Sequence, residues 1–271
     1  MGEELNKQLL YIAASSRKMA DPISVLILSQ SASGKSLLVD TVRQLMPEED
    51  VVAVSSLSDQ ALNYLPEGGL VHKFLILGEA VHAEVVEHQI REMLSAHELS
   101  RLVTVKDPKT GEMVTRTVRS PVVVSAVISS TRYQLNPENA SRAFVINSDE
   151  SREQTRRIHV LQRAKYSLSR HSAKRSRIPQ IIRRHQSAQR LLAPQLIVNP
   201  YADRLAFPDT LMRTRRDHER FIDLIASVCF LRQYQKKEKE HQDQATGEHL
   251  SYIDCDLTDY SYGNNKQLDL G

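Results

Sequence analysis

The chain has 271 residues, of which 41% are hydrophobic and 25% are charged, and its formal net charge is +3. These proportions are ordinary for a globular protein, and the length is ample for a buried core. No apolar run approaches the roughly 20 residues of a membrane helix, and the opening MGEELNKQLL lacks the build of a signal peptide. Cys229 and Cys255 do not resemble a disulfide framework or a zinc quartet. The composition therefore predicts a cytoplasmic protein with a packed thiol at Cys229 and no structural metal.

Basic residues are distributed unevenly along the chain. Between Ser151 and Arg190, twelve arginines and lysines stand against a single acid, Glu153. Such an imbalance is hard to maintain unless a polyanion neutralises it. The pattern favours a phosphate-bearing partner for this stretch, and a solvated basic face is the weaker interpretation.

The first elements in chain order are a helix over residues 4–19, a strand over residues 23–28, and a helix from Leu37 to Met46. The strand is an apolar, β-branched run, and the small-residue loop SQSASGKS joins it to the second helix. Strand, loop and helix in this order place backbone N–H groups and a helix N-terminus around the loop. This arrangement is typical of a site for nucleotide phosphates.

The loop follows the pattern GxxxxGK[ST] except that Ser29 stands at the first glycine. Lys35 would reach the β- and γ-phosphate oxygens of ATP, and the Ser36 hydroxyl would bind Mg²⁺. A positive φ would strain a serine, so the loop must avoid that conformation at Ser29 or tolerate the strain. An ordinary strand-to-helix turn is the alternative. The loop residues expected to contact the nucleotide are Ser31, Ala32, Ser33, Gly34, Lys35, Ser36 and Leu37.

The chain then alternates between strands and helices, which is typical of a parallel sheet. We expect strands over residues 51–54 and 73–77, with helices over residues 58–65 and 83–96. The second strand ends in Gly78-Glu79, where P-loop ATPases carry two acids, one for Mg²⁺ and one for the attacking water. Glu79 is the catalytic candidate, with a surface glutamate as the alternative. Gly78 weakens the prediction of fast hydrolysis but not that of binding.

Residues 102–118 alternate in polarity around the turn DPKTG and predict a β-hairpin. Its basic side chains could face a nucleic-acid backbone, and a solvated basic turn is an equally good interpretation. The residues concerned are Lys106, Lys109 and Arg116.

Residues 121–128 form the most continuously apolar strand, which we expect at the centre of the sheet. Ser130 and Thr131 follow it, and their hydroxyls would lie next to a γ-phosphate if this strand lies between the first strand and the Glu79 strand. A last strand over residues 143–146 comes directly after Arg142. An arginine here can stabilise charge on the nucleotide of a neighbouring subunit, and a surface arginine in a turn is the alternative.

Beyond residue 149 the hydrophobic period becomes helical. Helices are expected through Tyr166, over residues 181–192 and over residues 214–236, with Arg183 and Arg184 as nucleic-acid contacts on the second. The predicted organisation is an ATPase core over residues 1–150, a basic helical lid or nucleic-acid-binding region over residues 151–250, and a loosely ordered or truncated tail over residues 251–271.

Several motifs in order resemble one family, the helicase-like ATPase part of bacterial primase-related proteins with zinc-finger and Toprim domains. They are SQSASGKS, KFLILGEA, KDPKTGEMVT, VISST, ENASRAFVINSDESREQTRRIH, AQRLLAP and NPYADRLAFPDTLMRTRRDHERF, and they run from about Leu10 to about Tyr252. The resemblance implies an α/β, AAA+-like P-loop NTPase with sheet order 5-1-4-3-2, a β-hairpin insertion and a helical C-terminal lid. It also implies that Lys35 and Ser36 are the P-loop pair, Glu79 the second acid, Ser129 to Thr131 the sensor and Arg142 the arginine after it.

The chain departs from that family at Gly78, where an acid is usual, and it lacks the zinc-finger and Toprim parts. The expected function is an ATP- and Mg²⁺-dependent helicase-like activity on DNA, without sequence preference, in replication of a mobile element. We expect a homo-oligomer, with a separate primase or zinc-finger/Toprim chain as a candidate partner. The alternatives are a nucleotide-gated DNA-binding scaffold without hydrolysis, a decayed fragment and, more remotely, a P-loop kinase.

Overall fold

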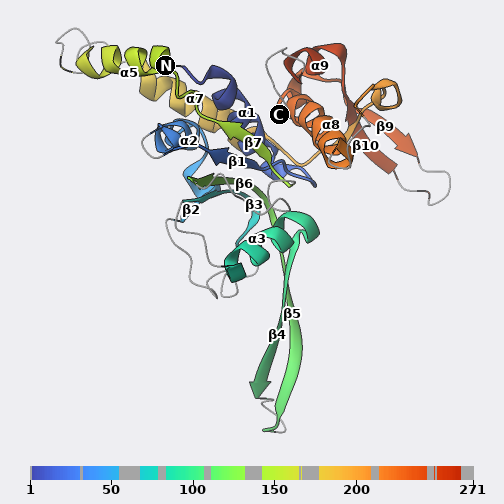
Figure 1. Cartoon of the computed structure of the whole chain (residues 1–271). Coiled ribbons are helices and arrows are strands. Elements are labelled where there is room, and N and C mark those ends of the chain that lie inside the picture. The colour runs from blue at the N-terminus through green and yellow to red at the C-terminus, as the bar shows by residue number, and fades with distance from the viewer. Residues whose placement is uncertain are drawn as a thin grey trace.

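A computed structural model shows an α/β architecture built on a five-stranded sheet, with a long two-stranded ribbon and a smaller C-terminal sheet (Figure 1). The structure describes residues 2–30, 33–54, 68–78, 84–106, 111–131, 142–164, 166, 177–208, 214–242, 247 and 249–263. The helix expected over residues 58–65 lies outside these ranges.

The central sheet has the order β2-β3-β6-β1-β7, and its strand pairs are all parallel. Counted without the hairpin strands, this is the order 5-1-4-3-2 that was expected, and the apolar strand β6 lies at the centre as predicted. Its strands are β1 (Val25–Leu28), β2 (Val51–Val54), β3 (Val71–Leu77), β6 (Val123–Ser130) and β7 (Phe144–Asn147).

Alternating side chains of the sheet enter two separate cores. On one face, Phe74 and Val127 pack with α1 (Glu4–Ser15) and α2 (Lys35–Arg43). On the other face, Leu75 and Leu77 pack with α3 (Glu84–Ala96). Because both faces are covered, the inner strands read as continuous apolar runs, which is why the sequence pattern located them.

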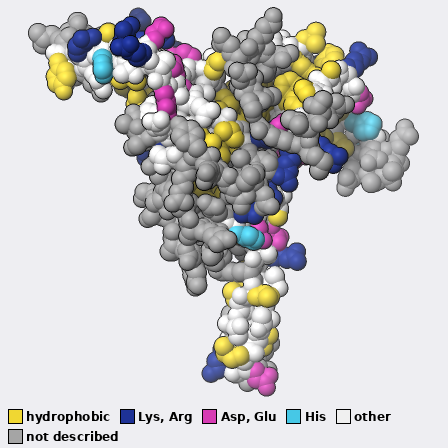
Figure 2. All heavy atoms as spheres, viewed as in Figure 1, with side chains coloured by type: hydrophobic (Ala, Val, Ile, Leu, Met, Phe, Trp, Pro, Cys, Tyr) yellow, Lys and Arg dark blue, Asp and Glu magenta, His cyan; other side chains and the backbone are white. Residues whose placement is uncertain are grey.

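The predicted hairpin is present and is longer than residues 102–118. Strands β4 (Glu98–Lys106) and β5 (Met113–Pro121) pair antiparallel along their whole length, from Glu98 opposite Pro121 to Lys106 opposite Met113. The ribbon projects away from the central sheet in Figure 1. Apolar side chains lie open along the ribbon in Figure 2. Two exposed apolar residues of its strands are Leu102, at 74% exposure, and Met113, at 67%. The described body of the protein therefore leaves the outer part of the ribbon uncovered.

Helices follow the central sheet, as predicted, and a small second sheet lies among them in the chain. This sheet has the order β8-β10-β9, with β8 parallel and β9 antiparallel to β10. The elements are α5 (Arg152–Ala164), α7 (Ile178–Leu191), β8 (Leu196–Val198), α8 (Thr214–Leu231), β9 (Lys239–Gln242), β10 (His249–Asp254) and α9 (Leu257–Gly263). Single-turn 3₁₀ helices lie at Ser16–Lys18 (η1), Glu48–Asp50 (η2), Ala202–Arg204 (η4) and Gln233–Gln235 (η5).

The expectation of a loosely ordered tail needs correction for residues 251–263, which form the end of β10 and α9. Asp259 is fully buried there and is paired with both Arg232 and Lys236. Cys255 and Ile253 pack against α8. The sequence showed no periodicity because ion pairs and a few buried side chains, not an amphipathic face, hold this segment.

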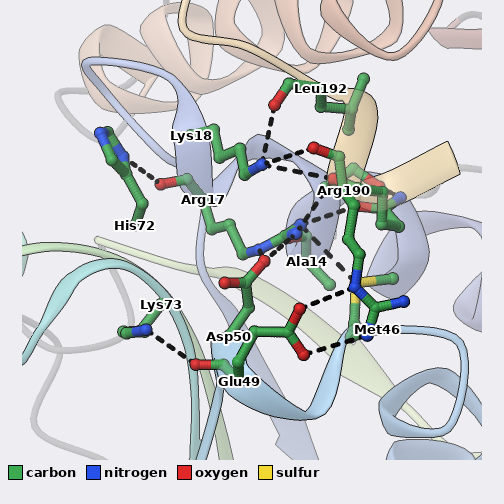
Figure 3. A network of polar contacts seen from close by, with 12 residues as sticks. Ala14, Arg17, Lys18, Met46, Glu49, Asp50, His72, Lys73, Arg190 and Leu192 are labelled. Atoms are coloured by element: carbon green, nitrogen blue, oxygen red, sulfur yellow. Dashed lines mark hydrogen bonds and ion pairs between the residues drawn. The ribbon is translucent and has the colours of Figure 1, made fainter. Parts of the chain in front are cut away.

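A buried polar network joins α7 to the central domain (Figure 3). Arg17 of η1, directly after α1, has no exposed surface, and its guanidinium lies 2.6 Å from both Asp50 Oδ2 and Gln189 Oε1. Lys18 donates to the Leu192 carbonyl, while Arg190 pairs with Glu49 at the surface. Leu224 of α8 also belongs to the core under the sheet. Elements from both sides of residue 150 thus share one buried interior.

Within the described ranges, no helix combines the length and the apolar character that a membrane crossing requires.

Candidate nucleotide site

The predicted loop lies at the carboxyl edge of the parallel sheet. Leu28, the last residue of β1, is in register with Ser130 of β6 and Asn147 of β7. The residues that follow these three strands therefore meet at one edge, which is where α/β proteins bind their ligands. As predicted, β6 lies between β1 and β3, which places Ser130 and Thr131 beside the loop.

Gly34 ends the loop and is the N-cap of α2. Its φ is 100° in the left-handed region, and no atom lies within 4 Å of the position a Cβ would take. Backbone conformation, rather than space, therefore requires a glycine here. The first-turn N–H groups of α2 have no intrahelical acceptors, so this helix end carries partial positive charge suited to an anion.

Lys35 lies inside the loop with only 6% of its surface exposed. Its Nζ donates to the Ser29 carbonyl at 2.7 Å and to the Gln30 carbonyl at 2.8 Å. These carbonyls hold the ammonium group inside the loop. A phosphate bound there would meet both this charge and the N-terminus of α2.

The other predicted loop residues surround the same turn. Ser36 is exposed in the first turn of α2, where an ion could reach it, and Leu37 beside it is 71% exposed. Ser33 is half-buried. Ser31 and Ala32 lie outside the described residues.

Ser29 does not have the backbone strain that a serine would have at a positive φ. Positive φ angles among the described non-glycine residues occur only at Glu3, His72 and His97, so Ser29 has none. Its N–H donates to the Ser130 carbonyl at 3.3 Å, and its Oγ accepts the N–H of Ser148 at 2.8 Å. The side chain is 2% exposed. The hydroxyl thus makes a contact that a glycine would not make.

A short turn after β7, Ser148 to Ser151, contacts the loop, and the sequence analysis missed it. Glu150 Oε1 accepts the N–H of Gln30 at 2.9 Å. Hydrogen bonds from Ser151 lower the pKa of Asp149 below its ordinary value. Ser151 also caps α5 by accepting the Gln154 N–H at 3.1 Å. The capping pattern was readable in the sequence, whereas the contact with Gln30 spans 120 residues and was not.

Gly78 reaches the same edge of the sheet. Leu77 is in register with Ile128, so Gly78 lies beside Ser129, and its N–H donates to the Val54 carbonyl at 3.1 Å. Glu79, the catalytic candidate, lies outside the described residues. Strand β3, which leads to Glu79, ends at Leu77, as predicted.

Arg142 lies at the amino ends of the parallel strands, opposite the edge that carries the loop. It is half-buried and precedes β7, whose first residue Phe144 is in register with Val25 at the start of β1. Four strand residues at about 3.3 Å each separate the two edges by roughly 13 Å. Arg142 therefore does not belong to the site of its own chain, so a role toward a nucleotide would require a neighbouring subunit.

The predicted nucleic-acid contacts fall in two separate places. Lys106 and Arg116 are exposed on the ribbon, but Lys106 lies opposite Met113 and Arg116 opposite Val103, which places them on its two different faces. Arg183 and Arg184 are exposed on α7, at the far end of the molecule from the ribbon in Figure 1. Figure 2 shows Lys and Arg side chains gathered over α5. Lys109 lies outside the described residues.

One group of metal-ligating side chains lies within the described residues. The ligand atoms of Cys229, Cys255 and Asp259 are all within 4.8 Å of one another. The hydrogen bond with Cys255 and burial raise the pKa of the Cys229 thiol, and Asp259 is paired with Arg232 and Lys236. Both thiols are buried and pack against α8 and its neighbours.

A comparison with protein-family models agrees with this geometry. A model described as the MTBMA_p00010 P-loop domain matches residues 1–179. The chain belongs to this P-loop domain family. The matched residues include the whole central sheet, the ribbon, α5 and the loop around Lys35. No curated protein matches the chain. Membership makes the chain a P-loop protein, and nucleotide binding is the function that a P-loop domain indicates.

Proposed function

We propose that this P-loop protein binds ATP with Mg²⁺ and uses its hydrolysis to act on DNA, as an AAA+-like, helicase-like module. The observation that carries the proposal is the position of Lys35. Its ammonium group is buried against the carbonyls of a loop that ends at a left-handed glycine and the N-terminus of a helix. The side chains present fit a magnesium nucleotide, because one cation, one exposed hydroxyl and a helix end meet at one edge of the sheet.

Each residue at the edge has a proposed role. Lys35 binds the β- and γ-phosphates, and Ser36 binds the Mg²⁺ that screens their charge. Ser130 and Thr131 lie next to the γ-phosphate, and Glu79 orients the attacking water. Arg142, at the other edge, acts on the nucleotide of a neighbouring copy, which is the reason to propose a homo-oligomer.

DNA contact is proposed at the ribbon and at the basic helices. The ribbon projects from the body and carries exposed cations, and the stretch from Ser151 to Arg190 is strongly basic. Such contacts neutralise phosphates and do not read bases, so affinity should depend on salt rather than on sequence. The helical region over residues 151–250 would act as the lid. A role in replication of a mobile element, with a separate primase or zinc-finger/Toprim chain, remains part of this proposal and rests on the sequence resemblance alone.

A second candidate function is a nucleotide-gated DNA-binding scaffold that hydrolyses ATP slowly or not at all. The observation that favours it is Gly78. This residue occupies the point beside Ser129 where P-loop ATPases carry an acid for Mg²⁺, and a glycine offers no ligand.

The test is phosphate release from ATP and Mg²⁺, with and without single-stranded DNA. The variants are Lys35→Ala and Glu79→Gln. Lys73→Ala is the matched control, because Lys73 lies near the start of β3, away from the loop, and its Nζ donates to the Glu49 carbonyl of η2. The proposal expects DNA-stimulated release that both test variants lose and the control keeps. Binding without release would favour the scaffold, and release that survives Lys35→Ala would refute the site.

A further inference from the structure

We propose that Ser29 and Glu150 are positioning residues for the nucleotide, because they tether the P-loop to the turn after β7. This inference rests on the proposed nucleotide binding, and it names two residues that the P-loop pattern does not contain. It predicts that restoring the pattern's glycine at Ser29 weakens nucleotide binding.

The tether fixes the two carbonyls that hold Lys35. Those carbonyls belong to Ser29 and Gln30. From the other side, Ser148 donates to Ser29 Oγ at 2.8 Å, and the Gln30 N–H donates to Glu150 at 2.9 Å. Each of the two residues that position the ammonium group is therefore held by the turn after β7.

A glycine at position 29 would weaken the contact between the P-loop and the turn after β7 in two ways. It lacks the hydroxyl that accepts the Ser148 N–H, and it has wider backbone freedom in the nucleotide-free loop. Binding would then have to order a looser loop, which weakens affinity. The backbone conformation gives no reason to prefer a glycine at position 29, because the φ of Ser29 is not positive.

The same turn leads directly into the basic helix α5. Ser151 caps that helix, and Asp149 accepts the Ser151 N–H at 2.9 Å while its own N–H donates to Glu3. Residues 149 and 151, on either side of Glu150, are thus themselves hydrogen-bonded, which helps to hold Glu150 beside Gln30.

Calorimetric titration with ATP and Mg²⁺ tests the tether in the full chain. Ser29→Gly and Ser29→Ala should each weaken binding about 3- to 10-fold, the usual effect of one lost hydrogen bond. Glu150→Ala should weaken it similarly. Glu150→Gln keeps an oxygen acceptor for the Gln30 N–H, so it should bind within about 2-fold of the parent.

Comparison of Glu150→Ala with Glu150→Gln distinguishes a positioning role of Glu150 from electrostatic repulsion of the phosphate. If the carboxylate merely repelled phosphate, both Glu150→Ala and Glu150→Gln would bind ATP more tightly, and the proposal would be wrong. Unchanged affinity in Ser29→Gly would refute it as well, while loss of binding in Lys35→Ala would still support the nucleotide site.

Amide hydrogen exchange without nucleotide gives a readout that is independent of ATP binding. The tether predicts faster exchange at Gln30 and Ser148 in Ser29→Ala and Glu150→Ala than in the parent. Equal exchange rates in the parent and both variants would overturn the tether even if the chain bound no nucleotide.

Discussion

Replacing Arg17 with methionine tests the buried link between α7 and the central domain. The Arg17 guanidinium is completely buried and donates to three residues in different elements: to Asp50 Oδ2 at 2.6 Å, to Gln189 Oε1 at 2.6 Å and to the Ala14 carbonyl at 3.1 Å (Figure 3). Methionine fills a similar volume but donates no hydrogen bond. The variant therefore leaves a carboxylate and a buried amide oxygen without their donor.

The expected loss of stability follows from the burial of each partner. Removing one member of a buried charge pair costs about 3–5 kcal/mol. Asp50 is 18% exposed and can regain some hydration, whereas Gln189 is fully buried and cannot. We therefore expect Arg17→Met to lower the free energy of unfolding by about 4 kcal/mol. Arg17→Lys should lose less, because it keeps the charge but not the planar fork.

Arg190→Ala is the matched control within the same network. Arg190 pairs with Glu49 at 2.7 Å, and both side chains are about half exposed, at 49% and 56%. The hydrogen bond from Arg190 is the main reason that the pKa of Glu49 falls to about 2. An exposed pair contributes little to stability because water and salt screen it, so this variant should unfold like the parent.

Urea unfolding followed by circular dichroism measures both variants, since the chain has no tryptophan to report by fluorescence. A loss below about 1 kcal/mol in Arg17→Met would contradict the assignment of a buried pair. A loss in Arg190→Ala as large as that in Arg17→Met would contradict the contrast between buried and exposed pairs.

Two further predictions concern pH and salt. Burial, followed by the charges of two neighbouring carboxylates, raises the pKa of Asp223 to about 7 in the folded chain. Ionisation of Asp223 therefore lowers the free energy of unfolding as the pH rises from about 4 to about 7. In urea unfolding, Asp223→Asn should be about 1–2 kcal/mol more stable than the parent above pH 7 and equally stable below pH 4. Equal stability at pH 8 would refute the shift. Lys106→Ala and Arg116→Ala should each weaken single-stranded DNA binding and lower the slope of log affinity against log salt by about 0.7, as measured by fluorescence anisotropy, and an unchanged slope would exclude phosphate contacts at the ribbon.

Local sequence patterns were sufficient for the elements that form the site. The apolar run before SQSASGKS predicted β1, and the prediction for β2 agrees with the structure at both ends. The continuous apolar character of β6 correctly predicted its central position. These features are readable because each depends on burial or backbone conformation within a short stretch.

The contacts that position the site could not be predicted in this way. Ser29 and Ser148 are 119 residues apart, and Arg17 and Gln189 are 172 residues apart. Each pair meets only because the fold brings two strand ends or two helix ends together. The sequence pattern therefore presented Ser29 as a departure from a motif, whereas the structure gives its hydroxyl a specific hydrogen bond.

Equilibrium binding of ATP with Mg²⁺ to the parent and to Lys35→Ala tests the nucleotide site most directly. Lys73→Ala serves as the control, and circular dichroism verifies that all three chains are folded. We expect saturable binding to the parent and the control, and affinity lower by at least about 10-fold in Lys35→Ala, because a charge-assisted contact to phosphate is lost. Equal affinity in the parent and Lys35→Ala, or no binding to the folded parent, would contradict it.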